Sequence, residues 1–274
     1  MNQSMPRSSG IARHSPASRV PPSPRSAPTV PSPACGGGLG RGPGEGRSEG
    51  RLADRVLYRD GLILVIDKPP RIAVHPGPGG GPNLESGFDE LRFGLPHPPA
   101  LAHRLDRDTS GCLVLGRHPK ALRRLGALFA SGKVEKVYWA IVEGKPPEAE
   151  GRIETRLTKQ TRASGWRMIV DPAGQSAVTD YRVCGAAEGR AWLELRPRTG
   201  RTHQLRVHCA ELGCPVVGDP VYGKGTGREP LMLYARSISL PLYPARPPIE
   251  ITAPVPPHML AALRPLGYEE VRAA

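Results

Sequence analysis

From Val56 onward, apolar and polar positions along the chain follow the two-residue period of β-strands more often than the helical period. The stretch "VLYRDGLILVIDKP" predicts two short strands joined at Asp60-Gly61, a dipeptide that favours hairpins, and Pro69-Pro70 ends the second strand. Cys112 to Gly116 is an uninterrupted apolar run that predicts a buried strand.

Strands are also predicted through the rest of the chain. In "VEKVYWAIVEG", Tyr138, Ala140 and Val142 fall on one face and the residues between them on the other. Six later segments read the same way: "GRIETRLT", "GWRMIV", "AVTDYRV", "AWLELRP", "LMLYARSISL" and "PIEITAP".

Three segments have helical spacing. The first places Leu122, Leu125, Leu128 and Phe129 on one face and ends at Gly132, which suits a C-cap. The second is predicted from Thr202 to Leu212, stopping at Gly213, and the third near His258 to Leu266. About nine or ten strands against three helices predict an α+β fold with a large mixed, mainly antiparallel sheet.

Residues 1–50 have a different composition, with nine Pro, nine Gly and nine Ser and no strand or helix period. Such a segment buries too little apolar surface to offset the entropy of ordering it, so it is expected to be a disordered tail. Its Arg-rich, acid-poor character also occurs in organelle transit peptides, but the prolines disfavour the amphipathic helix those need. An RNA-attracting tail or an over-extended gene start is the preferred interpretation. The expected domain is residues 51–274.

The formal net charge of the 274-residue chain is +13, and removing the seven arginines and two glutamates of residues 1–51 leaves 31 basic and 23 acidic residues. The folded part is therefore basic too, which favours a polyanionic partner. Apolar runs such as "GLILVI" are far shorter than the roughly 20 residues of a membrane-spanning helix. Five widely spaced cysteines without a C-x-x-C pair indicate reduced thiols and a cytoplasmic location.

The first chemically dense motif is "HRLDRDTSG", His103 to Gly111. Its charged side chains could be mutually neutralised charges of a surface loop, a two-carboxylate metal site or a nucleophile held by a guanidinium. Asp108 has a local explanation, because its side chain can cap the turn into the following strand. Asp106 has none, and a carboxylate beside a guanidinium stays ionised, as a nucleophile requires. The histidines and Cys209 show no recognised metal-ligand spacing, so no metal is expected.

The second dense motif runs from Arg196 to Gly223 and begins with five basic residues at a predicted strand-to-helix junction: Arg196, Arg198, Arg201, His203 and Arg206. Guanidiniums and backbone N–H groups at a helix start can bind phosphate or carboxylate. A solvated basic rim explains the same composition equally well.

Together these motifs resemble the RluA-type pseudouridine synthases, which isomerise uridine to pseudouridine in ribosomal or transfer RNA. "HRLDRDTSG" and "RTGRTHQLRVHCAELGCPVVGDPVYG" carry the resemblance, and "VIDKPPRIAVHPG", "EKVYWAIVEG" and "LMLYA" agree in order, over roughly residues 55–255. The resemblance implies the pseudouridine synthase fold, no cofactor, and an RNA partner.

The resemblance also implies site residues. Asp106 is then the catalytic aspartate, Tyr138 the active-site tyrosine that stacks on a flipped base, and Arg206 the arginine that pairs with the carboxylate. Leu233 takes the place of a leucine that packs against the base, although Tyr234 follows it here instead of the usual histidine.

The remaining basic residues of the two motifs are expected to contact RNA or to shape the loops that carry them: Arg104, Arg107, Arg198, Arg201 and His203. Many relatives have an N-terminal S4 RNA-binding domain, and the Pro/Gly/Ser tail does not resemble one. The chain is therefore expected to be a single-domain, monomeric enzyme acting on ribosomal RNA, transfer RNA or both.

Two rival hypotheses belong to other classes. One is an RNA-binding protein on the same scaffold without catalysis, against which the intact set of Asp106, Tyr138 and Arg206 argues. The other is a metal-dependent nuclease that uses Asp106 and Asp108. If the motif "EKVYWAIVEG" did not resemble the family, Tyr138 would be interpreted as an ordinary half-buried aromatic residue of a strand.

Overall fold

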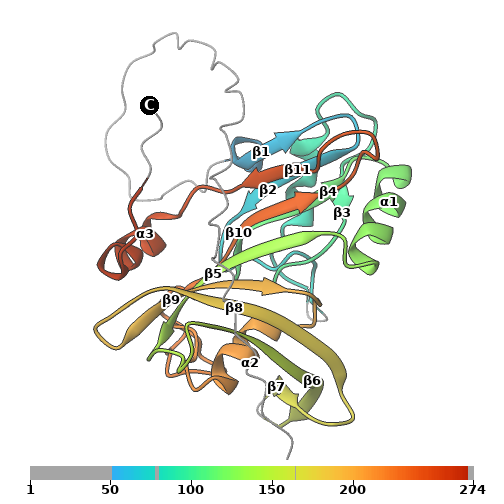
Figure 1. Cartoon of the computed structure of the whole chain (residues 1–274). Coiled ribbons are helices and arrows are strands. Elements are labelled where there is room, and N and C mark those ends of the chain that lie inside the picture. Colours follow the sequence, from blue (N-terminus) through green and yellow to red (C-terminus); the bar gives the residue numbers. More distant parts are fainter. Residues whose placement is uncertain (1–50, 78–79, 164, 271–274) are drawn as a thin grey trace, which may run out of the picture. The chain divides into compact units, whose positions relative to one another are not determined.

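A mixed sheet of eleven strands organises the residues that the structure describes, and its main order is β1-β2-β4-β10-β5-β9-β8-β6-β7. The structure is a computed structural model and describes residues 51–77, 80–163 and 165–270. Neighbouring strands run antiparallel except β4 and β10, which are parallel. The predicted mainly antiparallel α+β fold is confirmed (Figure 1).

The strands are β1 (Val56–Arg59), β2 (Ile63–Lys68), β3 (Ala100–Leu101), β4 (Ser110–Gly116), β5 (Glu135–Glu143), β6 (Glu150–Arg162), β7 (Gly165–Val170), β8 (Gln175–Ala187), β9 (Arg190–Pro197), β10 (Leu233–Leu240) and β11 (Ile249–Thr252). The α-helices are α1 (Pro119–Ala130), α2 (Gln204–Glu211) and α3 (Pro257–Leu263), and 3₁₀ helices span Leu52–Arg55, Glu85–Leu91 and Arg264–Leu266.

Strands β2 and β4 are apolar on both faces because both faces are covered. Ile63 and Val114 pack into one cluster with Met259 of α3, and Leu64 packs into another with Phe88 of the Glu85–Leu91 helix. At the other end of the sheet, α2 packs against β6, β7 and β8 (Figure 1). Burial on both faces explains why the β4 sequence lacks alternation.

The predicted helices are present with different ends. Helix α2 begins at Gln204 rather than Thr202, since His203 has a left-handed backbone with φ 52° and cannot continue a right-handed helix. Helix α3 gives way to a 3₁₀ turn at Arg264, because Pro265 has no N–H to continue the helical ladder. The two-residue strand β3 has too few positions to show a period, and the sequence did not predict it.

Gly111 allows β4 to approach β10 closely. Its φ is +106°, and a Cβ at this position would lie 2.3 Å from the carbonyl oxygen of Ala235. Only glycine fits this contact, which joins the strand after "HRLDRDTS" to the strand that begins with Leu233.

The described residues lie in the compact unit Ser48–Ala274. The tail predicted for residues 1–50 lies outside the described residues. No helix within the described ranges is long and apolar enough to cross a membrane.

Candidate active site

Four residues that are distant in the sequence line one hollow. Asp106 precedes β4, Tyr138 lies in β5, Leu233 begins β10, and Arg206 lies in α2. All four line a cavity of about 560 Å³. They meet because β4, β10 and β5 are neighbours in the centre of the sheet and α2 follows β9, the next strand.

Asp106 sits in a tight turn. Its backbone carbonyl accepts a hydrogen bond from the N–H of Thr109 at 3.2 Å. Its side chain is partly buried at the cavity wall. The carboxylate therefore faces the hollow from a loop that the backbone holds in place.

Lys68, at the end of β2, supports this turn. Its side chain is fully buried, and Nζ donates to the carbonyls of Pro69 at 2.8 Å and Arg107 at 3.0 Å. Burial lowers the pKa of Lys68 to about 8, and the nearby charges of Asp108 and Asp106 oppose that shift.

The predicted cap by Asp108 is wrong. Its carboxylate makes no hydrogen bond to the backbone among the described residues, where the turn is closed by the Asp106–Thr109 bond instead. Of the carboxylates acting on the ammonium of Lys68, Asp108 has the largest effect. Its position in the turn thus places a charge near a buried lysine.

The predicted pairing of Arg206 with Asp106 is also wrong. Arg206 instead binds Asp219 with two hydrogen bonds, Nε to Oδ2 and Nη2 to Oδ1, each 2.7 Å. The two side chains are only 4% and 0% exposed. Because Oδ1 also accepts the N–H groups of Val221 and Tyr222, Asp219 shapes its own turn as well.

The charges of Arg206, Asp219 and Asp106 affect one another. Burial alone would raise the pKa of the Asp219 carboxyl, but the hydrogen bonds and charge of Arg206 outweigh burial and lower it. Burial opposes the charge of Arg206, yet Asp219 and then Asp106 raise its pKa. Arg206 is therefore a fixed cation that acts on Asp106 across the cavity without a direct ion pair to it.

Tyr138 presents a neutral phenol to the cavity. Burial raises its pKa, and the charge of Asp106 raises it further. On the same strand, Lys136 also lines the cavity, where its Nζ donates to the carbonyl of Thr199 at 3.3 Å and burial lowers its pKa.

Leu233 and Tyr234 point to opposite sides of β10. Leu233 lines the cavity and packs in the cluster beneath it. Tyr234 is fully buried in the cluster on the other side, and its hydroxyl donates to the carbonyl of Pro254. The departure at position 234 is thus in the core, and Leu233 remains at the site.

The three histidines of the two motifs are hydrogen-bonded. His103 accepts the N–H of Val114 through Nε2 at 3.0 Å, and burial lowers its pKa to about 4. His208 lies between the hydroxyls of Thr155 and Thr179, each at 2.9 Å, and burial lowers its pKa to about 4 as well.

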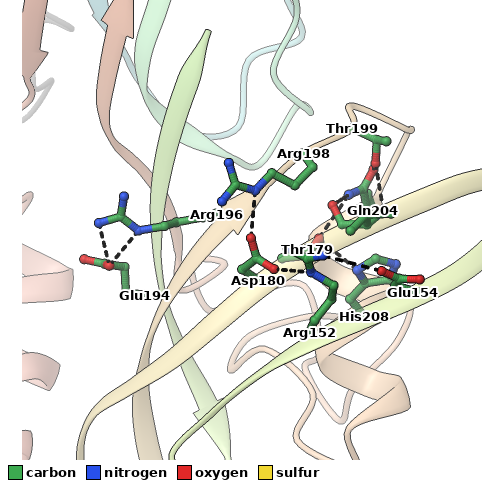
Figure 2. Close-up of polar contacts among 11 residues, drawn as sticks. Arg152, Glu154, Thr179, Asp180, Glu194, Arg196, Arg198, Thr199, Gln204 and His208 are labelled. Carbon is green, nitrogen blue, oxygen red and sulfur yellow. Dashed lines mark hydrogen bonds and ion pairs between the residues drawn. The ribbon is translucent and has the colours of Figure 1, made fainter. Parts of the chain in front are cut away.

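Several motif arginines at the rim are already paired with acids. Arg198 donates through Nε to Asp180 at 2.7 Å, Asp180 also accepts from Arg152 at 2.6 Å, and Arg196 binds Glu194 (Figure 2). These pairs favour a structural role for part of the predicted basic cluster.

Arg104, Arg107 and Arg201 stand apart from these pairs. Arg104 and Arg201 line the cavity, whereas Arg107 lies outside it and donates to the carbonyl of Arg71. Among the described residues, none of the three forms an ion pair with a carboxylate.

Gln204 fixes the loop between β9 and α2. Its Oε1 accepts from Thr199 Oγ1 at 2.7 Å and from the N–H of Arg201 at 3.0 Å. Its Nε2 donates to the carbonyl of Val178 and to Thr179 Oγ1, both at 3.0 Å (Figure 2). All four bonds of this amide are satisfied, so the loop that carries Arg201 is rigid.

The sequence reasoning missed Lys136, Gln204 and the pairing role of Asp219. Lys136 could have been found, since it lies two residues before Tyr138 and so shares its face. Within the described ranges, no group of three or more His, Cys, Asp or Glu side chains is placed to hold a metal ion.

Comparisons with known proteins show the family of this chain. Residues 62–211 match the family model described as RNA pseudouridylate synthase. An uncharacterised RNA pseudouridine synthase of Zymomonas mobilis is 46% identical over 75% of this chain and 95% of its own length. The ribosomal large subunit pseudouridine synthase D of Xanthomonas campestris is 35% identical over 80% of this chain and 71% of its own.

Solved structures give the same result. The human RNA pseudouridylate synthase domain containing 4 is 27% identical and superposes with a TM-score of 0.67 over 80% of this chain and 95% of that one. The family model covers the first motif and strands β2 to β9, and it ends in α2, within the second motif. This chain therefore belongs to the RNA pseudouridylate synthase family, as an enzyme of the RluA type that isomerises uridine in RNA.

Proposed function

We propose that Asp106 is the catalytic carboxylate and that the cavity around it receives one uridine flipped out of a structured RNA. The observation that carries this assignment is the convergence of Asp106, Tyr138, Arg206 and Leu233 on one hollow of about 560 Å³. A base that is stacked or paired cannot reach a carboxylate in the wall of such a hollow, so it must leave its stack.

The reaction breaks the C–N glycosidic bond, turns the uracil and rejoins it through C5. C5 loses its proton and N1 takes one up, so the product is an isomer of uridine. Attack at C1′, attack at C6 and a proton shift at C2′ all require Asp106 to be ionised. Arg206, held by two hydrogen bonds to Asp219, places a guanidinium in the wall of the same cavity. The charge arrangement that supports catalysis is thus set before substrate binds.

Tyr138 and Leu233 would hold the base. Because burial raises the pKa of Tyr138, its hydroxyl stays protonated near neutral pH and the residue is a poor phenolate base. Its ring is a stacking surface, and Leu233 adds an apolar contact from the neighbouring strand. This assignment gives Tyr138 a positioning role during the rotation of the uracil.

Further contacts to the RNA are assigned to Arg104 and Arg201 at the cavity and to Arg107 outside it, with smaller roles for Arg198 and His203. Phosphate contacts of this kind weaken steeply with salt. The named target of the Xanthomonas campestris relative is the large ribosomal subunit, which supports ribosomal RNA as a substrate here. Transfer RNA remains part of the proposal.

The test uses RNA labelled with tritium at uridine C5, incubated with the protein in EDTA. The wild type is expected to release tritium, and Asp106→Asn to release none while still binding RNA. Release by Asp106→Asn at the wild-type rate would overturn the assignment. Loss of wild-type release in EDTA, with RNA cleavage restored by Mg²⁺, would favour the nuclease.

The inactive RNA-binding alternative makes a different prediction, since it would bind RNA with no release by the wild type. Mapping pseudouridines in a deletion strain would identify the RNA and the position. We also propose residues 51–274 as the catalytic domain, acting as a monomer in the cytoplasm. Light scattering of the purified chain and fractionation of cells test the last two points.

A further inference from the structure

A second groove opens beside the catalytic cavity. It shares Arg104, Gly200, Arg201 and Thr202 with the cavity. Its far wall is the β6–β7 hairpin, which contributes Lys159, Trp166 and Met168. Among the described residues that line it, three are cationic and none is acidic.

Trp166 is the unusual residue of this groove. Its exposed fraction is 44%, and it belongs to none of the buried clusters formed by the described residues. A large aromatic side chain contributes little to stability in such a position. Its placement beside a basic groove needs another explanation.

The ring of Trp166 is held in a fixed orientation. It stacks on His203 with centroids 4.9 Å apart and an interplanar angle of 29°. His203 Nδ1 is 3.0 Å from the hydroxyl of Tyr222, and that hydroxyl accepts the N–H of Met168 at 2.9 Å. The hairpin and the start of α2 are therefore tied together through this column of rings.

A cation already lies near the ring. Lys159 Nζ is 4.9 Å from the centroid of Trp166, and the lysine is exposed on the neighbouring strand. An exposed ammonium on a flexible stem can move to a phosphate when one is present, which leaves ring surface for a base. Alternating cations and aromatic rings along a groove are the arrangement that binds single-stranded RNA.

We propose that Trp166 is a stacking platform for an unpaired nucleotide that flanks the target uridine in the same RNA strand. Arg104 and Arg201 then hold the phosphates between that nucleotide and the catalytic cavity. This inference rests on the proposed function and adds a second binding position to it. Base stacking tolerates any base, so the site would select for an unpaired neighbour rather than for a sequence.

Intrinsic fluorescence gives the first test. Trp139 and Trp192 pack against one another and Tyr268 in the core, so Trp166 is the exposed member of the three tryptophans. Substrate RNA is expected to quench the wild-type signal, and Trp166→Phe to remove that quenching while retaining most of the binding. Equal quenching in wild type and Trp166→Phe would overturn the proposal.

The second test couples the tryptophan to one nucleotide. Trp166→Ala is expected to weaken binding about 5- to 100-fold, with little change in the single-turnover rate at saturating RNA. Substrates with an abasic site at each of the three positions on either side of the uridine are compared. At one position, the abasic site should weaken wild-type binding but not that of Trp166→Ala. If the loss of binding caused by the abasic site and the loss caused by Trp166→Ala add together at every position, the proposal is overturned.

The matched control is Phe93→Ala. Phe93 is 36% exposed and lies under the guanidinium of Arg59, 4.3 Å from the ring centroid, away from both hollows. This variant should bind RNA like the wild type. If wild-type protein binds and quenches but releases no tritium, the proposed function fails while the stacking site stands. Normal release with normal binding by Trp166→Ala refutes the stacking site alone.

Discussion

The buried ion pair between Arg206 and Asp219 gives the sharpest test of the site geometry. We consider Asp219→Asn, which preserves shape but removes the charge. Asn can keep one oxygen for the N–H groups of Val221 and Tyr222, while its amide would face a donor of Arg206. A buried guanidinium is then left without a counter-charge and with an unsatisfied N–H.

The magnitude follows from burial. Breaking a buried ion pair by removing one partner costs about 3–5 kcal/mol. For a folded unit of this size, a loss of about 1 kcal/mol lowers the melting temperature by roughly 2–4 °C. Asp219→Asn is therefore expected to lower the melting temperature by roughly 6–20 °C.

Asp180→Asn is the matched control. Asp180 also pairs with arginines, Arg152 and Arg198, but those side chains are 55% and 58% exposed. Exposed pairs contribute about 0–1 kcal/mol, so this variant should change the free energy of unfolding by less than about 1 kcal/mol.

Urea denaturation followed by far-ultraviolet circular dichroism measures both variants. If Asp219→Asn lowers the free energy of unfolding by less than about 1 kcal/mol, as Asp180→Asn does, burial does not make the Arg206–Asp219 pair essential to stability. Arg206→Met alone should cost a similar amount. Combining Asp219→Asn with Arg206→Met should lower the free energy of unfolding by less than the sum of the two single losses. Each single variant leaves one buried charge without its partner, and the double variant has neither charge.

Three further predictions concern the supports of the site. The folded-state pKa of His208, about 4, lies below its unfolded value of about 6.5. The contribution of neutral His208 to the free energy of unfolding is therefore intact above pH 6.5, and up to about 3 kcal/mol of it is lost as the pH falls from 6.5 to 4. His208→Gln should flatten that pH dependence in urea titrations. Gln204→Leu should remove four hydrogen bonds, destabilise the protein by about 2–4 kcal/mol and slow tritium release, and unchanged hydrogen exchange in residues 198–204 would contradict this. Gly111→Ala should cost more than about 4 kcal/mol, since its Cβ would overlap the Ala235 carbonyl, and a soluble variant with wild-type melting would exclude the predicted clash.

The sequence alone determined the three helices, the chemically dense motifs and all the described strands except the two-residue β3. Alternating and continuous apolar runs report burial on one or both faces of a strand, and this signal is local. Tyr138 and Leu233 could be placed in their strands for the same reason. The ends of α2 and α3 depended on a left-handed His203 and on the position of Pro265, and the sequence marked only the second.

Only the tertiary structure decided which charges meet. Asp106 is flanked by arginines in the sequence and Asp219 is not, so spacing could not show that Arg206 would bind Asp219. Nor could it show Lys68 buried beneath the loop of Asp106, or Trp166 stacked on His203. The Arg206–Asp219 pair joins α2 to the turn after it. The other two contacts join segments that the order of the sheet brings together, and pairing across a sheet depends on the whole arrangement of strands rather than on any one of them.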